Sequence, residues 1–321
     1  MEKTEPNPLI SIIIAVLNRR ELLVRTLASI ESQRFRDFEL IISDNGSDDG
    51  TAEVIENWKV RFEKKGIRTV GVTEPRRGIC QARNRGLREA RGKYVMFFDS
   101  DDEMLPGHLE LLAGELTQHP EIDLMWFDIK EQDEDGWTSV KSVDDRNEMR
   151  GHILHSTLAS ARFVVSRELL VGLGGLDESI YAWEDVELGV RLLAAAKKKR
   201  KLNCEPQVVV HPHRDSITGS SFANKRESLE RSLDLCEEAL KRYGREDECV
   251  WVDVKRMVLA GLYAREGEKE LSARLSDKVL AKTGSGRRRI ALGFVRDTVA
   301  YFGRGGCAIG KALIRQDKGS K

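Results

Sequence analysis

The sequence predicts an α/β protein with a doubly wound, mostly parallel sheet and a helical extension at its C-terminal end. Short β-branched apolar runs alternate with amphipathic stretches over roughly the first 130 residues, and the pattern beyond residue 218 is helical. Strands that alternate with helices form parallel sheets whose two faces those helices cover. The length of 321 residues fits one large α/β domain with an appendage.

The first strand is predicted over residues 9–17. This run, LISIIIAVL, is continuous and β-branched between Pro8 and the polar Asn18, which is typical of a strand buried on both faces. Helical spacing of apolar residues follows over residues 21–33. The alternation continues with predicted strands at 38–43, 67–73, 94–98 and 122–129 and predicted helices at 52–65, 81–90 and 107–118.

The chain becomes more polar and mixed after residue 130. We place the end of the α/β domain near residue 218, with a first half of about 8–130 and a second half of about 131–218. Residues 219–321 then form the helical extension, because their apolar residues recur at helical spacing. The elements expected after residue 130 are strands at 161–165 and 208–211 and helices at 185–196, 222–243, 250–264 and 271–279.

Composition and charge exclude several classes of protein. The chain has 53 basic and 53 acidic residues, and 40% of its residues are apolar, as in an ordinary folded protein. Residues 287–321 hold 9 basic and 2 acidic groups, an excess too local for nucleic-acid binding by the whole protein. Five scattered cysteines, no basic leader and no apolar run of membrane length predict a cytoplasmic protein.

Acidic side chains follow two of the predicted strands, in SDNGSDDGT at 43–51 and FFDSDD at 97–102. In an open parallel sheet, ligands bind beyond the carboxyl ends of the strands. Asp99, Asp101 and Asp102 repel one another unless a cation is present, and Mg²⁺ and Mn²⁺ prefer such oxygen ligands together with phosphates. Taken alone, both segments are also explained as solvated turns and helix caps. Their common place at strand ends favours a metal-bridged diphosphate.

Four sequence blocks in a fixed order carry a resemblance to a known family. They are ISIIIAVLNRRELL, ISDNGSDDGT, GICQARNRGLREARGKYVMFFDSDD and GGLDESIYAWEDVELGVRLL. Over about residues 8–218 the chain resembles the family 2 glycosyltransferases, whose fold is the Rossmann-like GT-A fold. Each block is weak alone, but their order and separation are specific. The resemblance implies an enzyme that uses a nucleotide-diphosphate sugar.

The resemblance also implies the donor side of the site. Asp44 would bind the nucleotide base by a hydrogen bond, and Asp99 and Asp101 would form the acidic DXD motif, with Asp101 as the direct ligand of Mn²⁺ or Mg²⁺. The other donor-binding residues implied are Val16, Asn18, Asp48 and Arg83. Without the motif, Arg83 reads as a surface helix charge, although a guanidinium can also neutralise phosphate or brace a carboxylate. The family usually has an aromatic residue where this chain has Leu17, so a UDP-sugar is only weakly favoured over other donors.

The acceptor side is implied by WEDVELGVRLL. Asp185 would be the catalytic base, with Trp183 and Glu184 contacting the acceptor. Helical spacing after Asp185 puts the acidic pair in the first turn of a helix, whose positive end favours an ionised carboxylate. The alternative is that the two acids lie at the start of a helix without a catalytic role. Packing explains Trp183 equally well.

Two histidines, His211 and His213, follow the last predicted strand of the α/β domain. The family often has a histidine followed by a serine here, and His213 with Ser216 fits that spacing better than His211. His213 would then ligate the metal or contact the diphosphate. A structural histidine is the alternative.

The predicted reaction is transfer of a sugar to an acceptor hydroxyl by single displacement, which inverts the anomeric centre. Asp185 would take the acceptor proton while the metal stabilises the leaving diphosphate. A sugar-nucleotide nucleotidyltransferase is a rival, but it would need a Gly-rich loop after the first strand, and this chain has none there. A non-catalytic nucleotide- or sugar-binding module is the other alternative.

The acceptor and the location of the reaction are predicted from the family and the tail. We expect a cell-surface glycan or a lipid-linked sugar as the acceptor. Residues 287–289 are three arginines, and an apolar helical stretch follows them. Such a segment can lie on an anionic membrane surface, so we hypothesise peripheral membrane association, with packing on the preceding helical hairpin as the alternative.

Overall fold

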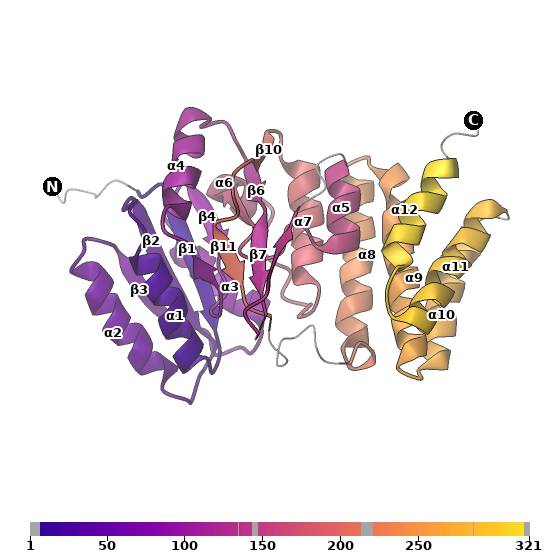
Figure 1. Cartoon of the computed structure of the whole chain (residues 1–321), viewed down its shortest axis with the longest axis horizontal. Coiled ribbons are helices and arrows are strands. Elements are labelled where there is room, and N and C mark those ends of the chain that lie inside the picture. The colour runs from indigo at the N-terminus through magenta and orange to yellow at the C-terminus, as the bar shows by residue number, and fades with distance from the viewer. Residues whose placement is uncertain (1–6, 134, 143–146, 213–220, 285, 318–321) are drawn as a thin grey trace.

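Figure 1 shows the computed structural model, with the sheet and its helices on the left and a group of helices on the right. The structure describes all residues except 1–6, 134, 143–146, 213–220, 285 and 318–321. The domain boundary predicted at residue 218 therefore lies outside the described residues, and the division into two units stays a prediction.

The central sheet has seven strands in the order β10-β6-β9-β4-β1-β2-β3. All neighbouring pairs are parallel except those made by β9, which runs antiparallel to β4 and β6. The strands are β1 (Ile10–Val16), β2 (Phe38–Asp44), β3 (Thr69–Thr73), β4 (Tyr94–Phe97), β6 (Leu124–Phe127), β9 (Phe163–Ser166) and β10 (Lys199–Leu202). The predicted doubly wound, mostly parallel sheet is confirmed. The edge strand β10, which begins KRK, was not predicted, because it lacks an apolar run.

Helices cover both faces of this sheet, because successive side chains of a strand point to opposite faces. In β1, Ile12 and Ile14 belong to one hydrophobic core and Ile13 belongs to the other. The first core is completed by α1 (Arg20–Glu31), α2 (Thr51–Glu63) and α4 (His108–Gln118). The second is completed by α3 (Ile79–Glu89), α5 (Glu148–His155), α6 (Arg167–Gly172) and α7 (Glu184–Ala195).

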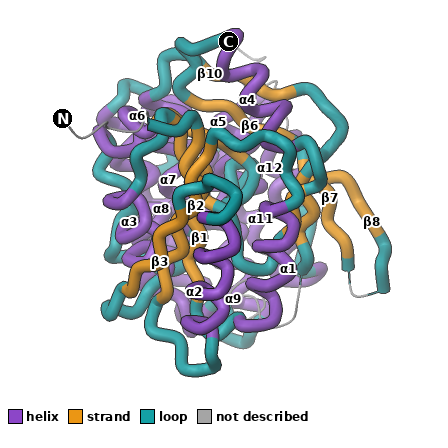
Figure 2. Tube along the Cα trace, turned by 90° about the vertical axis from the view of Figure 1, so that its left-hand side faces the viewer, coloured by secondary structure: helices purple, strands orange, loops and turns teal. Residues whose placement is uncertain are grey.

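A second sheet of four strands has the order β5-β11-β7-β8. Its strands are β5 (Glu103–Met104), β7 (Ile129–Gln132), β8 (Thr138–Lys141) and β11 (Val208–Val210). The prediction of a single strand over residues 122–129 was wrong in one respect. In the structure this strand, β6, ends at Phe127, and after Asp128 the chain enters the second sheet as β7. Strand β8 is exposed along its length and stands out from the body of the molecule (Figure 2).

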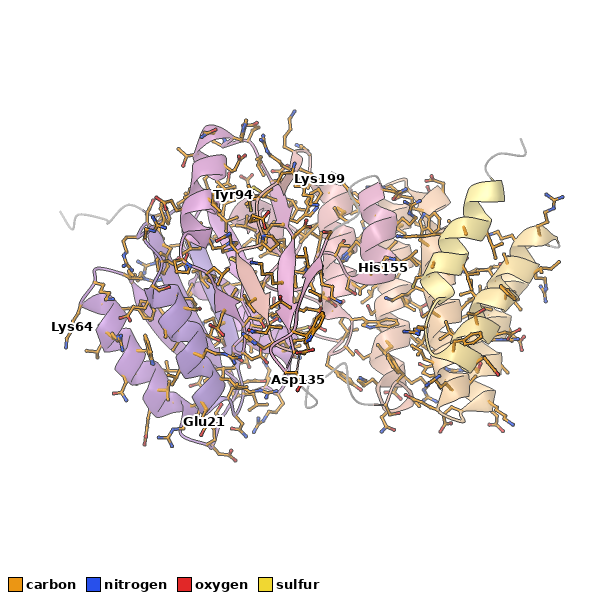
Figure 3. The ribbon with its side chains drawn as sticks, in the orientation of Figure 1. Glu21, Lys64, Tyr94, Asp135, His155 and Lys199 are labelled. Atoms are coloured by element: carbon orange, nitrogen blue, oxygen red, sulfur yellow. The ribbon has the colours of Figure 1, made fainter. Side chains whose placement is uncertain are left out.

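The carboxyl ends of the parallel strands lie at the lower edge of the molecule in Figure 3. Glu21, near the start of α1, and Asp135, in the turn between β7 and β8, are both at this edge. Tyr94 and Lys199, the first residues of β4 and β10, lie at the upper edge. The predicted site residues that follow strands therefore share one rim with the β7–β8 turn.

The C-terminal helices are α8 (Arg226–Arg242), α9 (Cys249–Arg265), α10 (Lys269–Lys282), α11 (Arg287–Phe302) and α12 (Gly306–Asp317). Their apolar side chains belong to the same core as α5 and α7, so the sheet and these helices share buried surface. Helix α11 packs on α9 and buries Leu292, Val295 and Val299. Within the described residues, no helix is long and apolar enough to cross a membrane.

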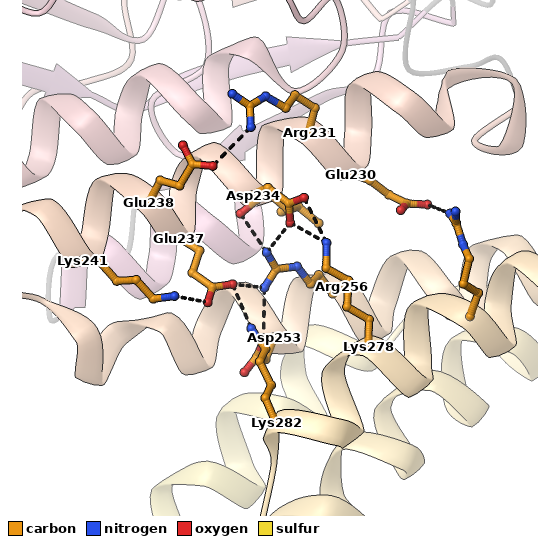
Figure 4. A network of polar contacts seen from close by, with 12 residues as sticks. Glu230, Arg231, Asp234, Glu237, Glu238, Lys241, Asp253, Arg256, Lys278 and Lys282 are labelled. Atoms are coloured by element: carbon orange, nitrogen blue, oxygen red, sulfur yellow. Dashed lines mark hydrogen bonds and ion pairs between the residues drawn. The ribbon is translucent and has the colours of Figure 1, made fainter.

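Helix α9 is fixed by a buried arginine. Arg256 is 1% exposed, and its guanidinium binds Asp234 at 2.7 Å and Glu237, both on α8, as well as Asp253 on α9 itself. Lysines of α10 bind the same carboxylates of α8 (Figure 4). Because a buried charge is tolerated only when it is paired, this network sets how α9 sits between α8 and α10.

His108 predicts a pH dependence of stability. Its ring is buried edge-on against Phe127, at 4.8 Å between ring centroids, and neither ring nitrogen has a hydrogen-bond partner among the described residues. Burial lowers the pKa of His108 to about 3, below the value of about 6.5 in an unfolded chain. Between these two pKa values the unfolded chain therefore binds more protons than the folded chain does. The stability that the folded state has while both states hold a neutral His108 is lost as the pH falls below about 6.5.

We therefore compare the wild type with His108→Leu by urea unfolding at pH 8 and pH 5. The free energy of unfolding of the wild type should fall relative to the variant by about 2 kcal/mol between the two pH values. A constant difference between the two proteins would contradict a neutral buried His108.

Candidate active site

The loops after β1 and β2 are joined at the rim by hydrogen bonds. The amide of Asn18 donates to the Ser47 hydroxyl at 2.9 Å, and the Asn18 side-chain oxygen accepts from the Asp48 amide at 2.9 Å. The Asp44 carboxylate accepts from the amide and the hydroxyl of Ser47, at 3.0 and 2.6 Å. Val16 pairs with Asp44 in the parallel register. Four of the predicted donor-binding residues are thus brought together, with the Asp48 side chain exposed.

Asn45 organises the neighbouring loop and was missed as a site residue. Its side-chain nitrogen donates to the carbonyls of Glu74 and Arg76 at 2.9 and 2.8 Å, and its oxygen accepts from the Gly78 amide at 2.8 Å. Asn45 is 4% exposed. The asparagine stands in the block SDNGSDDGT, but an Asn-Gly pair also reads as a turn, so the sequence did not distinguish the two roles.

The acidic turn after β4 is held by the helix α1 and by the end of β11. The carbonyls of Asp101 and Asp102 accept hydrogen bonds from Arg25 and Thr26 of α1. The Asp102 carboxylate accepts from the His211 amide at 3.2 Å, and burial raises the pKa of Asp102 well above its usual value. Asp102 is therefore part of the support of this turn, which leaves Asp99 and Asp101 as its candidate ligand residues.

Arg83 of α3 connects the two halves of the site. Its side chain is 7% exposed, and it binds the Asp99 carboxylate at 2.8 Å and the Glu184 carboxylate at 3.2 Å. Asp99 follows β4, whereas Glu184 opens α7. The alternative of a surface helix charge is excluded, because the guanidinium is buried between carboxylates from both sides of the site.

Glu184 and Asp185 occupy the first turn of α7, as predicted. The Asp185 carboxylate accepts from the Val186 amide at 2.9 Å. Burial raises the pKa of Asp185, and the Val186 amide and the nearby cations partly offset that effect. Burial also raises the pKa of Glu184 to about 7, against the opposing charge of Arg83. Two adjacent acids with raised pKa values are the kind of pair that functional sites use for proton transfer.

His152 of α5 supports the start of α7 and was not predicted from the sequence. Its Nδ1 accepts from the Leu158 amide at 3.1 Å, so its Nε2 must carry the proton and donate to the Val186 carbonyl at 3.0 Å. A Cβ atom on Gly189 would lie 2.1 Å from Nε2, so only glycine allows this close approach. Nothing in the local pattern around His152 signals a contact with a helix more than 30 residues away.

Trp183 directly precedes this acidic pair with a left-handed backbone, φ 58° and ψ 28°. Its ring packs against the core and lies 4.6 Å from the Lys255 ammonium. The packing interpretation of Trp183 therefore holds, while its contact with an acceptor stays a prediction. His213 lies outside the described residues. His211, the second choice from the sequence, lies beside the acidic turn with its Nε2 2.8 Å from Glu103.

The donor set suits a hard cation that shares its coordination with a ligand. Among the described residues, no three His, Cys, Asp or Glu side chains are arranged to hold a metal ion by themselves. Asp99 and Asp101 offer a pair of carboxylates, and Mg²⁺ is commonly held by one or two carboxylates together with substrate phosphates. The residues present therefore fit a metal that binds with a diphosphate.

A doubly wound sheet with polar loops at its carboxyl edge is the architecture of proteins that bind nucleotides at that edge. The family model described as Glycosyl transferase family 2 matches residues 11–168. Over these residues, which are just under half of the chain, the resemblance to the family 2 glycosyltransferases is confirmed. Asp185 and the C-terminal helices lie beyond the matched residues.

Solved structures share the GT-A fold with this chain. The structure of Staphylococcus aureus TarS 1–349 in complex with UDP has a TM-score of 0.65 at 14% identity, covering 92% of each chain. The mannosyltransferase PcManGT from Pyrobaculum calidifontis, in complex with GDP-Man and Mn²⁺, has a TM-score of 0.57 at 18% identity, covering 96% of this chain and 86% of that one. The predicted fold is thereby confirmed.

Curated relatives match shorter segments. A Campylobacter jejuni GalNAc(5)-diNAcBac-PP-undecaprenol beta-1,3-glucosyltransferase is 36% identical over 111 residues, which are 35% of each protein. The putative teichuronic acid biosynthesis glycosyltransferase TuaG of Bacillus subtilis is 36% identical over 107 residues, 33% of this chain and 41% of TuaG. An uncharacterised Haemophilus influenzae glycosyltransferase is 24% identical over 236 residues, 72% of this chain and 74% of the relative. The chain thus spans about a third of the length of the first of these relatives.

Arg83→Met should destabilise the fold, because it leaves Asp99 and Glu184 without their shared cation. We expect the free energy of unfolding in urea at pH 7.5 to fall by about 3 kcal/mol. This value is at the low end for a broken buried ion pair, because the Asp99 side chain is 36% exposed. The triple variant Arg83→Met/Asp99→Asn/Glu184→Gln should recover most of this loss. Equal losses in both variants would mean that Arg83 stabilises the fold only by packing.

Proposed function

We propose that this chain is a metal-dependent, inverting glycosyltransferase that moves a sugar from a nucleotide-diphosphate donor to an acceptor hydroxyl. The observation that carries the proposal is the bridge made by Arg83. Its guanidinium binds both Asp99, in the acidic turn after β4, and Glu184, which directly precedes Asp185. A donor bound at the acidic turn and an acceptor bound at the start of α7 would therefore meet around this arginine.

The donor would occupy the rim formed by the loops after β1, β2 and β4. Asp44 is our candidate for the base-binding residue, and the backbone around Val16, Asn18 and Asp48 would line the nucleotide. The proposal is supported by neighbours of the same fold that were solved with UDP, UDP-GlcNAc and GDP-Man. These ligands carry two different bases, and the exposed Leu17 would pack on a base with less geometric selectivity than an aromatic ring.

Asp99 and Asp101 would hold the divalent cation, Mn²⁺ or Mg²⁺, which supplies charge stabilisation to the leaving diphosphate when bound. His213 stays a candidate further ligand on the sequence resemblance alone. Arg83 would keep Asp99 in place and add positive charge beside the leaving diphosphate. The mannosyltransferase PcManGT was solved with Mn²⁺ as well as GDP-Man, which supports this assignment.

Asp185 would act as the catalytic base. As the acceptor oxygen attacks the anomeric carbon, its proton passes to the Asp185 carboxylate, and the bond from that carbon to the donor phosphate breaks. One displacement inverts the configuration. The α7 N-terminus favours the ionised carboxylate that this step requires, and Trp183 and Glu184 would contact the acceptor beside it.

Asp185→Asn should lower kcat/KM about 10²- to 10⁴-fold, because the amide cannot take the proton, and should leave donor affinity nearly unchanged. We would measure nucleoside diphosphate release from UDP-, GDP- and dTDP-sugars with a panel of acceptors, and donor binding by thermal shift. Asp37→Asn, an exposed residue just before β2 at the opposite edge of the sheet, is the matched control. Full activity of Asp185→Asn would remove it as the base.

Asp101→Asn should abolish the stimulation of this release by Mn²⁺ or Mg²⁺ and weaken metal-dependent donor binding, because one of two carboxylate ligands is lost. The same donor panel is titrated with metal for the wild type and the variant. Unchanged metal dependence would contradict the assignment. If the wild type showed neither donor release nor metal-dependent binding, a non-catalytic binding module would replace the proposed enzyme.

We also propose that the acceptor is a cell-surface glycan or lipid-linked sugar and that the protein meets it at a membrane surface. The names of the Campylobacter and TuaG relatives point to such acceptors. On α11 the side chains opposite the face packed on α9 stay exposed, namely Ile290 at 75%, Phe294 at 58% and Tyr301 at 79%. Arginines 287–289 open the same helix, and this combination suits an anionic bilayer.

The triple variant Ile290→Ser/Phe294→Ser/Tyr301→Ser should bind vesicles containing phosphatidylglycerol at least tenfold more weakly than the wild type, because it removes apolar area available to the bilayer. Flotation measures the bound fraction. The control Val24→Ser/Val60→Ser/Val171→Ser changes exposed apolar residues elsewhere and should bind like the wild type. If the wild type does not bind, or if both variants bind equally well, the membrane proposal fails.

A further inference from the structure

Lys255 of α9 is a buried charge that the proposed mechanism does not use. It is 7% exposed, and among the described residues no carboxylate lies within 4.0 Å of its ammonium. The ammonium donates to the Leu154 carbonyl at 3.3 Å and lies 4.6 Å from the centre of the Trp183 ring. A carbonyl oxygen and an aromatic face both favour the protonated amine. Burying a charge is costly, so its place calls for a physical explanation.

The position of Lys255 is fixed by its neighbour in the chain. Arg256 binds Asp234, Glu237 and Asp253 (Figure 4), and these contacts hold α9 against α8. Adjacent helix positions project in different directions. The same rigid turn of α9 therefore anchors Arg256 among α8 and α10 and aims Lys255 toward α5 and the start of α7.

The segment that contacts Lys255 is itself strained and is held by α8. Trp183 adopts φ 58°, a left-handed conformation that is strained for a bulky residue and persists only where its surroundings impose it. The Ser228 hydroxyl accepts from the amides of Tyr181 and Ala182 at 2.8 and 2.9 Å, and the Ser232 hydroxyl donates to the Trp183 carbonyl at 2.8 Å. Two helices of the C-terminal region thus hold the residues just before Asp185.

We infer that Lys255 is a positioning residue for Asp185, so that α8 and α9 complete the active site of the sheet domain. This inference rests on the proposed function, in which Asp185 is the base. The Lys255 ammonium orders the Trp183 ring, and through it the first turn of α7, and it supplies positive charge that favours the ionised Asp185 carboxylate.

Asp185 lies among charges from every element around it. Lys255 and Arg83 favour its ionised form, and Glu184 beside it and Asp99 across the site oppose it. The fifth group is Arg162, which precedes β9 and interacts favourably with Asp185. Arg83 is shared with two other carboxylates, whereas Lys255 has no carboxylate within 4.0 Å among the described residues.

Lys255 also lies near groups other than Asp185. Burial lowers the pKa of the Lys255 ammonium, and the nearby Cys307, Asp185 and Cys236 oppose that effect. The nearby His152 is neutral, because burial lowers its pKa to about 4. Asp185 is the one carboxylate among the groups that favour the charged form of Lys255 in the described part of the chain.

The first test measures the coupling between the two residues without relying on activity. Urea unfolding is followed at pH 8 and pH 4 for the wild type, Lys255→Met, Asp185→Asn and the double variant. At pH 8 the loss of stability caused by Lys255→Met should be larger in the wild-type background than in the Asp185→Asn background, and at pH 4 the two losses should converge as Asp185 is protonated. Equal losses at pH 8 would overturn the inference.

The second test is the pH profile of kcat/KM for a donor that the wild type turns over in the panel of UDP-, GDP- and dTDP-sugars. Removal of one nearby positive charge should move the acid limb by roughly one pH unit. Lys255→Met should then be about tenfold slower than the wild type at acid pH and approach it at high pH, while Lys255→Arg keeps the limb in place. A loss that is uniform across the pH range would show a merely structural lysine and overturn the inference.

Lys269→Met, an exposed lysine at the start of α10, controls for the loss of a lysine from the same group of helices and should match the wild type in both tests. The two tests separate the two proposals. If the wild type turns over no donor while the unfolding data show the coupling, the proposed enzymatic function fails and the electrostatic coupling of Lys255 to Asp185 stands. If the wild type turns over a donor but the unfolding data show no coupling, the proposed function stands and the inference about Lys255 fails.

Discussion

The buried guanidinium of Arg83 is the interaction on which the site depends. It is the point where the carboxyl edge of the sheet, through Asp99, meets the start of α7, through Glu184. Burying these groups separately would be costly, and only their pairing makes the arrangement stable. The same pairing fixes the distance between the acidic turn after β4 and the residue beside Asp185. Stability and site geometry therefore come from one contact.

The electrostatics of the site follow from an excess of acids around that contact. Burial raises the pKa values of Asp102, Glu184 and Asp185, because the local cations do not fully compensate these carboxylates. A site with uncompensated carboxylates beside a buried arginine suits ligands that bring both a cation and phosphates. The rim thus fits the metal and the diphosphate that we propose as its ligands, although its carboxylates alone form no complete metal cage within the described residues.

The C-terminal helices are more than an appendage in this structure. They share a hydrophobic core with α5 and α7, and Ser228, Ser232 and Lys255 hold the backbone and ring of residues 181–183. The match to the glycosyl transferase family 2 model ends at residue 168, before Asp185 and before these helices. Residues beyond the matched segment therefore hold the start of α7, where our proposed base Asp185 lies.

The sequence by itself determined the elements whose signal is local. The β-branched run of β1, the alternation of strands and helices, and the carboxylates at strand ends all follow from patterns within about 20 residues, and these placed Asp44 and Asp99 at one edge. Only the tertiary structure decided which distant groups meet: Arg83 with Glu184, 101 residues apart, His152 with the start of α7, and Lys255 with Trp183. Three charged residues at 253, 255 and 256 stand within an apolar helix, and nothing in their spacing identifies the groups that they contact. Periodicity specifies which face of an element is buried, whereas helix packing specifies what that face touches.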